Sequence, residues 1–321
     1  MTNVITVTIN PAVDVLMSVD RIVPTHKMRC ALARRDPGGG GINVARVLKR
    51  LGSEVIAVYP IGGLLGTLLR RLVDDEGVPC LTIGVSEETR EDITVLERTT
   101  ELQYRFIQPG PKLTEQEWQA CLEAVISLYR RDISAPHDRR ARFVVASGSL
   151  PPGVPDDFYS QIASAAQRAE ARMVVDASGL SLKRALEAGV YLVKPSLSEF
   201  RELIGNPMNN ETDCVSACRS LIDDGRVEMV ALTLGDQGAL LVSREQALRA
   251  QALAIKPVSV VGAGDSFLGA MIWSLSSGQS IEVAFRYAVA AGSATLMMPG
   301  TELCRREDVE RLVNDVKVQM I

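Results

Sequence analysis

The sequence predicts an α/β protein with a mainly parallel central sheet, helices on both of its faces and a small additional β-sheet. Short β-branched runs alternate with stretches of helical periodicity along most of the chain, an order typical of parallel sheets. The 321 residues, 46 % of them hydrophobic, are enough to form a large core. Two segments, 13–36 and 89–108, break the alternation because they contain strand-like sequence and no helix.

The regular elements can be placed one after another. A β-branched run over 4–9 predicts a strand that ends at Asn10-Pro11. After the glycines at 38–41, apolar residues recur with helical spacing from Val44 to Leu51, and Gly52 ends this helix. The further predicted elements are strand 55–59, helix 64–76, helix 118–129, strand 143–146, helix 156–170, strand 173–176, strand 191–193, helix 197–204, a helix around Ala217 and strand 229–234.

The two irregular segments predict a small antiparallel sheet that projects from the main domain. Alternating sequence at 13–17, 93–96 and 103–107 supplies its strands. Such an open sheet would leave Val13, Val15 and Met17 unburied, which predicts pairing with a second copy and therefore a homodimer. The charged stretch 130–142 predicts a solvated surface loop.

Composition excludes several classes of function. A net charge of -4 and an aromatic content of 4 % give no general reason to bind nucleic acid. The six cysteines are scattered without metal-ligand spacing and are expected to be reduced thiols. We find neither a signal sequence nor a membrane-spanning run, so we expect a soluble, cytoplasmic protein with no membrane partner.

The clearest chemical signal is the run Val261-Gly262-Ala263-Gly264-Asp265, which opens a helix. Two glycines before a helix let several backbone N–H groups converge, and the helix dipole adds to an anion site. A carboxylate in such a place suits a general base that takes a proton from a hydroxyl while the amides stabilise a transferred phosphoryl group. The alternative, that Asp265 caps the helix, stays open at this point.

A second signal is the glycine run at 37–43, which ends in Asn43. A dinucleotide-binding loop does not fit, because the third glycine position and the leading strand are missing. A Walker phosphate loop is excluded, since no Lys-Ser or Lys-Thr follows. The run instead indicates a surface that a polyhydroxylated ligand can approach closely, with Asn43 offering a donor and an acceptor.

Four cationic residues of the irregular segments predict a phosphorylated ligand. Lys27 and Arg29 share one face of a predicted strand, and Arg90 and Arg105 come from the second segment. The planar guanidinium group of arginine matches phosphate oxygens. The alternative is that all four are solvated surface charges.

The sequence carries five motifs in order, namely NPAVD at 10–14, GGGINVA at 39–45, SGSLPPG at 147–153, KPSxxE at 194–199 and GAGD at 262–265. In these it resembles the PfkB, or ribokinase-like, carbohydrate kinase family over essentially its full length. Within the family, 37–46, 147–153 and GTELC at 300–304 are most similar to the bacterial 6-phosphofructokinases of isozyme 2 type.

The resemblance implies one ribokinase-like three-layer domain over 1–321, with segments 13–36 and 89–108 forming a β lid. It implies ATP-dependent phosphorylation of fructose 6-phosphate to fructose 1,6-bisphosphate, with tagatose-6-phosphate kinase and 1-phosphofructokinase as alternatives. Mg²⁺ with ATP and a monovalent cation such as K⁺ would be the cofactors, and the lid would pair two subunits. A nucleoside or free-sugar kinase, and a non-catalytic sugar-phosphate-binding regulator, remain as competing hypotheses.

The resemblance also assigns residues. Asp265 would be the general base, within an anion hole of Gly262, Ala263 and Gly264. Asp14, Gly39, Gly40, Asn43 and Ser149 would contact the sugar, and Lys194, Ser196, Thr233, Gly235 and Gly238 would lie near the nucleotide. Glu199 would act on Mg²⁺ through water. One departure is Ser196, because the family has asparagine there, and this weakens the magnesium assignment.

Overall fold

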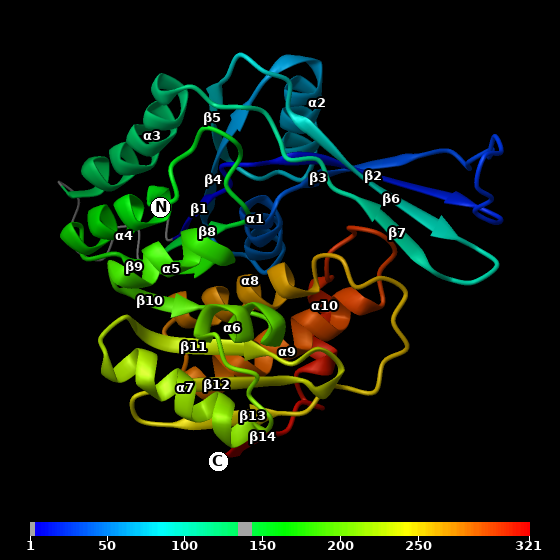
Figure 1. Cartoon of the computed structure of the whole chain (residues 1–321). Helices are drawn as coiled ribbons and strands as arrows, with labels where there is room; N and C mark the ends of the chain where they lie inside the picture. Colours follow the sequence, from blue (N-terminus) through cyan, green and yellow to red (C-terminus); the bar gives the residue numbers. More distant parts are fainter. Residues whose placement is uncertain (1–3, 134–142) are drawn as a thin grey trace.

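The computed structural model describes residues 4–133 and 143–321, and in these residues it contains one large and one small sheet (Figure 1). The large sheet has ten strands in the order β14-β13-β12-β11-β10-β9-β8-β1-β4-β5. Its strands are β1 (Val4–Val7), β4 (Val55–Ile61), β5 (Cys80–Gly84), β8 (Phe143–Ser147), β9 (Arg172–Asp176), β10 (Val190–Val193), β11 (Val227–Thr233), β12 (Ala239–Ser243), β13 (Ala247–Ala250) and β14 (Val318–Met320). Neighbours from β5 to β11 are parallel, whereas β12, β13 and β14 are antiparallel additions.

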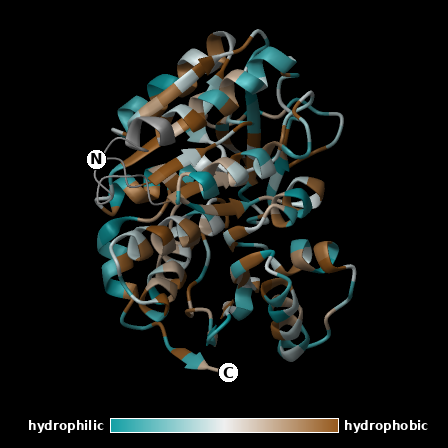
Figure 2. Ribbon diagram, turned by 90° about the vertical axis from the view of Figure 1, so that its left-hand side faces the viewer, coloured by the Kyte–Doolittle hydropathy of each residue, from teal (hydrophilic) through white to brown (hydrophobic). Residues whose placement is uncertain are grey.

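Helices cover both faces of this sheet and enclose two separate cores. One core includes residues of α1 (Gly40–Arg50), α2 (Gly63–Asp75), α8 (Ala263–Ser276), α9 (Ile281–Leu296) and α10 (Arg306–Leu312). The other includes residues of α3 (Glu115–Ile133), α4 (Phe158–Arg168), α5 (Gly179–Glu187), α6 (Leu197–Ile204) and α7 (Glu211–Asp223). Figure 2 shows hydrophobic residues concentrated on the central strands, as expected for a sheet buried on both faces. The predicted three-layer α/β fold is confirmed.

The small sheet, which we call the lid, has the order β3-β2-β6-β7 and extends away from the large sheet (Figure 1). Its strands are β2 (Ala12–Val19), β3 (Arg34–Gly38), β6 (Arg90–Glu97) and β7 (Gln103–Phe106). The β2–β3 and β6–β7 pairs are antiparallel as predicted, but the central β2–β6 pair is parallel. The reason is that β2 and β6 continue from β1 and β5, which run in the same direction in the large sheet.

Two local predictions need correction. Residues 20–33 form no strand, so the shared strand face predicted for Lys27 and Arg29 is wrong, and both side chains are exposed in this stretch. Helix α3 continues to Ile133, so the loop predicted from residue 130 begins later, and its remainder lies outside the described residues. Among the residues that the structure describes, no helix combines the length and the apolar character needed to cross a membrane.

The topology brings functional segments together at one edge of the large sheet. The parallel strands β1, β8, β9, β10 and β11 all end at this edge, and in such sheets ligands bind outside the carboxyl ends of the strands. The predicted motifs at 147–153 and 194–199 follow β8 and β10 directly. They therefore meet the first turns of α1 and α8.

Candidate active site

A cleft of ≈ 390 Å³ lies at this edge of the sheet and extends to the lid. Its lining comes from both sheets and from the first turns of α1, α6 and α8. The residues that line it are Asp14, Gly39, Gly40, Asn43, Arg90, Asp92, Arg105, Ile107, Ser147, Gly148, Ser149, Asp176, Ala177, Ser178, Glu199, Val260, Val261, Gly262, Gly264 and Asp265. Most of the predicted catalytic and sugar-binding residues are thus brought to one cleft.

Asp265 occupies the third position of α8 and faces this cleft. The N-cap of α8 is Gly262, whose left-handed backbone (φ 77°) suits glycine. The Asp265 carboxylate does not serve as the N-cap. Its Oδ2 accepts a hydrogen bond of 2.9 Å from Asn43 Nδ2 of α1. The interpretation of Asp265 as a helix cap is therefore wrong, and its carboxylate is available to the cleft.

The surroundings of Asp265 adjust its basicity. Burial and the negative charge of Asp176 raise the pKa of Asp265 to about 6, against the opposing effects of Asn43, Lys194 and Arg46. A carboxyl group with this pKa is ionised at neutral pH and is a better proton acceptor than an ordinary aspartate. These properties are those required of a general base.

The start of α8 also offers positive potential. N–H groups in the first turn of a helix lack intrahelical partners and attract anions. Lys194 adds its charge here, because a Cβ built on Gly264 would lie 3.2 Å from Lys194 Nζ. Lys194 is buried and forms a 3.1 Å ion pair with Asp176 at the end of β9. Residues 262–264 and Lys194 thus form a positively polarised end to the cleft.

The first turn of α1 packs closely against the strand ends. A Cβ on Gly40 would lie 2.1 Å from Ser147 Oγ, so no side chain fits between α1 and β8. The glycines leave backbone exposed to the cleft, and Asn43 follows one turn later. Ser149, on the far side, accepts a 3.2 Å hydrogen bond from Asn10 Nδ2. This part of the cleft has the backbone and hydroxyl groups that suit a sugar.

The lid contributes a cluster of charges over the cleft. Burial and the neighbouring Asp92 raise the pKa of Asp14 to about 7, although Arg105 opposes this rise. Arg90 donates to Gln108 O (2.6 Å) and Asn10 O (3.1 Å), and its Nη2 lies 3.6 Å from Asp92 Oδ2. Arg105 is exposed and makes no hydrogen bond or ion pair with the described residues. Its guanidinium group is therefore free to bind an anion.

Several predicted residues lie elsewhere. Lys27 and Arg29 do not line the cleft. Ser196 and Thr233 form a bridge between β10 and β11 beside Lys194. Gly238 has a structural reason of its own, since a Cβ there would approach Ala250 O to 2.2 Å. The five predicted nucleotide residues thus lie at or beyond the ends of β10 and β11, outside the lining of the cleft.

Two acidic residues of the cleft were missed by sequence reasoning. Asp92 is two residues from Arg90 on β6 and shares its face, a period-2 signal that was present in the sequence. Asp176 is the last residue of β9, and its position at the carboxyl end of a parallel strand could have identified it.

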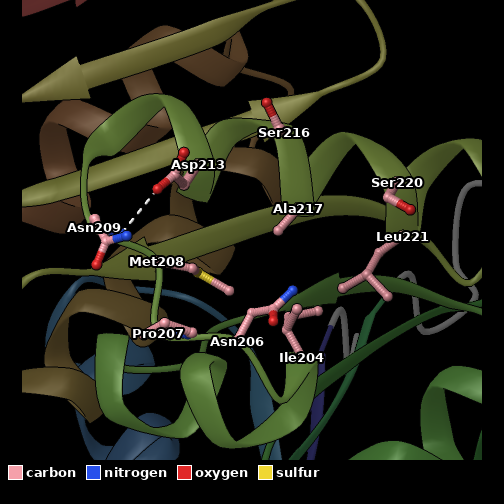
Figure 3. Close-up of a pocket in the computed structure, with 10 residues that line it drawn as sticks. All are labelled: Ile204, Asn206, Pro207, Met208, Asn209, Asp213, Ser216, Ala217, Ser220 and Leu221. Carbon is pink, nitrogen blue, oxygen red and sulfur yellow. Dashed lines mark hydrogen bonds between the residues drawn. The ribbon is translucent and has the colours of Figure 1, made fainter.

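A second cavity, of ≈ 550 Å³, lies between the end of α6 and helix α7 (Figure 3). It is at the opposite end of α6 from Glu199. Its acidic residue is Asp213, whose carboxylate accepts a 2.8 Å hydrogen bond from the Asn209 backbone. Because it lacks both a cation and an activated nucleophile, the cleft beneath the lid is the better candidate for chemistry.

Comparisons with known proteins agree with this choice of site. A family model described as pfkB family carbohydrate kinase matches residues 7–308. The ATP-dependent 6-phosphofructokinase isozyme 2 of Mycobacterium tuberculosis (strain CDC 1551 / Oshkosh) is 45 % identical over 308 residues, covering 96 % of this chain and 88 % of that protein. The isozyme 2 of Escherichia coli (strain K12) is 37 % identical over 313 residues, covering 97 % and 98 %. A crystal structure of phosphofructokinase-2 from E. coli in complex with fructose-6-phosphate superimposes with a TM-score of 0.89 at 36 % identity, covering 98 % and 99 %.

Proposed function

The chain belongs to the pfkB family of carbohydrate kinases, and from this premise we propose that it uses ATP to phosphorylate fructose 6-phosphate to fructose 1,6-bisphosphate. The observation that carries the proposal is the arrangement of the cleft. A general base at the start of α8 lies at one side, and Arg90 and Arg105 of the lid lie at the other. The resemblance to 6-phosphofructokinases supports this substrate.

In the proposed reaction Asp265 accepts the proton of the sugar hydroxyl as that oxygen attacks the γ-phosphorus. A new O–P bond forms, the bond from the γ-phosphorus to the ADP oxygen breaks, and the proton resides on Asp265. The amides of 262–264 and the ammonium group of Lys194 stabilise the negative charge of the transferred group. Sugar hydroxyls contact Asp14, Asn43, Ser149 and the backbone of Gly39 and Gly40, while Arg90 and Arg105 hold the substrate's own phosphate.

The donor set of the cleft fits a magnesium ion that arrives with ATP. Mg²⁺ prefers oxygen ligands and is usually held by one or two carboxylates, waters and substrate phosphates. Asp176 is paired with Lys194, so Glu199, at the first turn of α6, is the residue that would hold the ion through water. When bound, the ion would offset charge on the phosphates. Among the described residues we assign no site to the monovalent cation.

The nucleotide is proposed to lie along the ends of β10 and β11. Lys194, Ser196, Thr233 and the turn that contains Gly235 and Gly238 present backbone groups and one cation there. This location would direct the γ-phosphate toward the start of α8. We further propose that 1–321 is one kinase domain whose lid (13–36 and 89–108) pairs two subunits, with Lys27 and Arg29 contributing to phosphate binding from this exposed segment.

The proposal is tested by ATP consumption with a panel of free sugars, nucleosides and sugar phosphates, including fructose 1-phosphate and tagatose 6-phosphate. We expect the highest kcat/KM with fructose 6-phosphate. A preference for another phosphosugar would assign one of the alternative kinases, and a preference for a free sugar or nucleoside would remove the role of the lid arginines. Sugar-phosphate binding without ATP turnover would identify a regulator.

The role of Asp265 is tested by Asp265→Asn. We expect the fold and substrate binding to persist and kcat to fall by about 10²- to 10⁴-fold, the usual effect of losing a general base. Asp315→Asn, which changes an exposed aspartate, is the matched control. Near-normal turnover in Asp265→Asn would exclude this carboxylate from the mechanism.

A further inference from the structure

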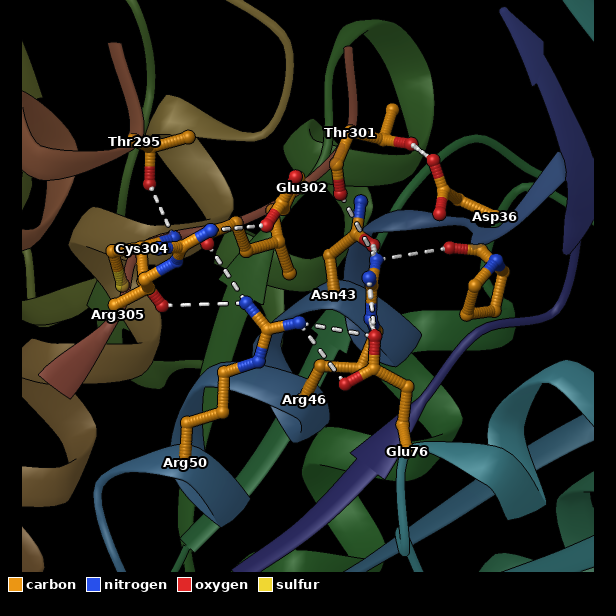
Figure 4. A network of polar contacts seen from close by, with 12 residues as sticks. Asp36, Asn43, Arg46, Arg50, Glu76, Thr295, Thr301, Glu302, Cys304 and Arg305 are labelled. Carbon is orange, nitrogen blue, oxygen red and sulfur yellow. Dashed lines mark hydrogen bonds and ion pairs between the residues drawn. The ribbon is translucent and has the colours of Figure 1, made fainter. Parts of the chain in front are cut away.

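Arg46 of α1 is the most deeply buried cation behind the cleft among the described residues, with an exposed fraction of 1 %. It does not line the cleft and is separated from Asp265 by Asn43 (Figure 4). Its Nε and Nη2 donate to Glu76 Oε1 at 3.1 and 2.7 Å. Its Nη1 donates to Asn43 Oδ1 at 3.1 Å and lies within reach of Pro37 O and Thr301 O. One guanidinium group thus connects the glycine run, the chain after α9 and the asparagine beside the base.

The chemistry of these groups determines how the Asn43 side chain is oriented. A guanidinium group has donors and no acceptor, so it can be met only by the Asn43 carbonyl oxygen. Asn43 and Arg46 are three residues apart on α1 and therefore lie on the same face. With Oδ1 directed to Arg46, the Nδ2 group must point to Asp265, where it donates at 2.9 Å. The reverse orientation would place a carbonyl oxygen against a carboxylate and an amide against a guanidinium group.

We propose that Arg46, anchored by Glu76, is a positioning residue that fixes the Asn43 amide so that Asp265 is held ionised and directed into the cleft. The inference rests on the proposed role of Asp265 as general base. It adds a chain of contacts, Glu76–Arg46–Asn43–Asp265, in which only the last two members face the substrate. Burial raises the pKa of Glu76, but Arg46 and Arg50 outweigh this effect and lower it overall, so the anchor is ionised.

Other charges also act on Asp265 and must be held constant in any test. Asp176 of β9 raises its pKa and Lys194 at the end of β10 lowers it, and the Asp14 carboxylate of the lid is close enough to interact with it. Arg46 lowers the pKa both through its charge and through Asn43. Its removal should therefore shift the acidic limb of the pH profile toward higher pH.

Arg50 provides a matched control within the same network. It donates to both Glu76 oxygens at 3.0 Å and to the backbone of Leu303 at 2.7 Å. It therefore shares the anchor and the neighbouring backbone with Arg46 but makes no printed contact with Asn43. Loss of Arg50 tests the structural part of the network, and loss of Arg46 tests the contact with Asn43 as well.

The experiment compares pH profiles of kcat/KM for Arg46→Met, Glu76→Gln, Arg50→Met and the unchanged enzyme, with ATP and fructose 6-phosphate. For Arg46→Met we expect the acidic limb to rise by about 0.5 to 1 pH unit and kcat at pH 7 to fall by about 5- to 50-fold from misalignment, with KM for ATP changed little. Glu76→Gln, at a half-exposed site that perturbs folding less, should show a smaller shift in the same direction. Arg50→Met should lower the melting temperature and leave the profile unchanged.

The outcomes separate this inference from the proposed function. If the unchanged enzyme lacks kinase activity, the proposed function fails. If it is active but Arg46→Met and Glu76→Gln keep its pH profile, or Arg50→Met shifts the profile equally, the positioning role is wrong. If Arg46→Met does not fold, Glu76→Gln with the Arg50→Met control still decides the question.

Discussion

The carboxyl group of Asp14 illustrates how the lid accommodates charge before any ligand binds. In the unfolded chain its ordinary pKa is 3.8, whereas in the folded protein burial and Asp92 raise the pKa to about 7. Between these values the native state holds more protons than the unfolded state, so the free energy of unfolding falls as the pH rises. Asp14 in the free enzyme is therefore a destabilising group at neutral and alkaline pH.

This reasoning predicts that Asp14→Asn stabilises the ligand-free protein in a pH-dependent way. Asparagine does not titrate, so the gain should be larger at pH 8 than at pH 5, by about 1 to 3 kcal/mol. Urea unfolding at the two pH values measures the difference. The exposed Asp315→Asn control should show the same small effect at both. A gain that is equal at pH 5 and pH 8 would mean that the Asp14 carboxyl is not strained by its surroundings.

Arg105 is the better probe of phosphate recognition, because Arg90 already supports the backbone at Gln108 and Asn10. We predict that Arg105→Ala lowers kcat/KM for the phosphosugar by about 10- to 150-fold through loss of a charge-assisted hydrogen bond. The change should appear mainly in KM for the sugar, not for ATP, and Arg105→Lys should recover part of it. Arg98→Ala, which removes another exposed lid arginine, is the control. Unchanged phosphosugar kinetics in Arg105→Ala would make this arginine a surface charge.

Residue identity was predictable where chemistry requires a local motif. Asp265, Asn43 and the glycines stand in runs whose spacing reports their role, and the structure brings them together. Asp176 lacks such a run, because what selects it is its place at a strand end next to Lys194, a neighbour that only the folded sheet supplies. Lys27 and Arg29 show the opposite error. Their alternation resembled a strand, but residues 20–33 form none in the structure.

At the scale of elements, α6 shows how Ser196 differs from the expected asparagine. Ser196 is the N-cap of α6, and with Glu199 it forms a reciprocal capping box in which Ser196 N donates to Glu199 Oε2 at 2.7 Å. Serine and asparagine are about equally good N-caps. The cap therefore holds the Glu199 carboxylate in place whichever of these two residues is present.

We predict that Ser196→Ala destabilises the protein by about 1 kcal/mol, whereas Ser196→Asn is close to neutral. Because the lost cap also frees Glu199, Ser196→Ala should raise the Mg²⁺ concentration that gives half-maximal activity, and Ser196→Asn should not. Thermal unfolding measures the first effect and a Mg²⁺ titration at fixed ATP the second. A destabilised Ser196→Ala enzyme with an unchanged Mg²⁺ requirement would separate Glu199 from metal use.

Helices were easier to predict than strand pairing. The α6 helix agrees with the predicted 197–204 because its cap, period and Gly205 are all local signals. The antiparallel strands β12, β13 and β14 were not predicted, and the parallel β2–β6 pair was not expected. Strand pairing depends on segments far apart in the chain, such as Arg249 and Gln319, so no local pattern reports it.

At the scale of the whole molecule, the exposed apolar surface lies on the lid for a different reason than predicted. Val13 and Val15 are buried within the single chain, so the argument that they need a second copy is wrong. The exposed apolar side chains of the lid are instead on β7 and in residues 20–33. They are Val23, Met28, Leu32, Leu102, Tyr104, Phe106 and Ile107. A cluster of this kind on a monomer usually marks an interaction site.

This surface sharpens the prediction of a homodimer through the lid. Strand β7 is an edge strand with an unpaired backbone, and Phe106 on it is 59 % exposed. Pairing with a second copy would cover both, since edge strands and exposed apolar patches favour association. We expect the chain of 34.7 kDa to have twice this mass in solution at micromolar concentration. Sedimentation equilibrium measures it directly.

Phe106→Asp and Leu32→Asp should dissociate the dimer, because each places a charge in an interface that would otherwise exclude water. Met320→Asp is the matched control. Met320 is 74 % exposed on β14, at the far end of the large sheet from the lid (Figure 1), so its change should leave the mass unaltered. A fully active unchanged protein with the mass of one chain would show that the lid works without a partner. Dissociation by Met320→Asp alone would instead place the interface on the edge formed by β14.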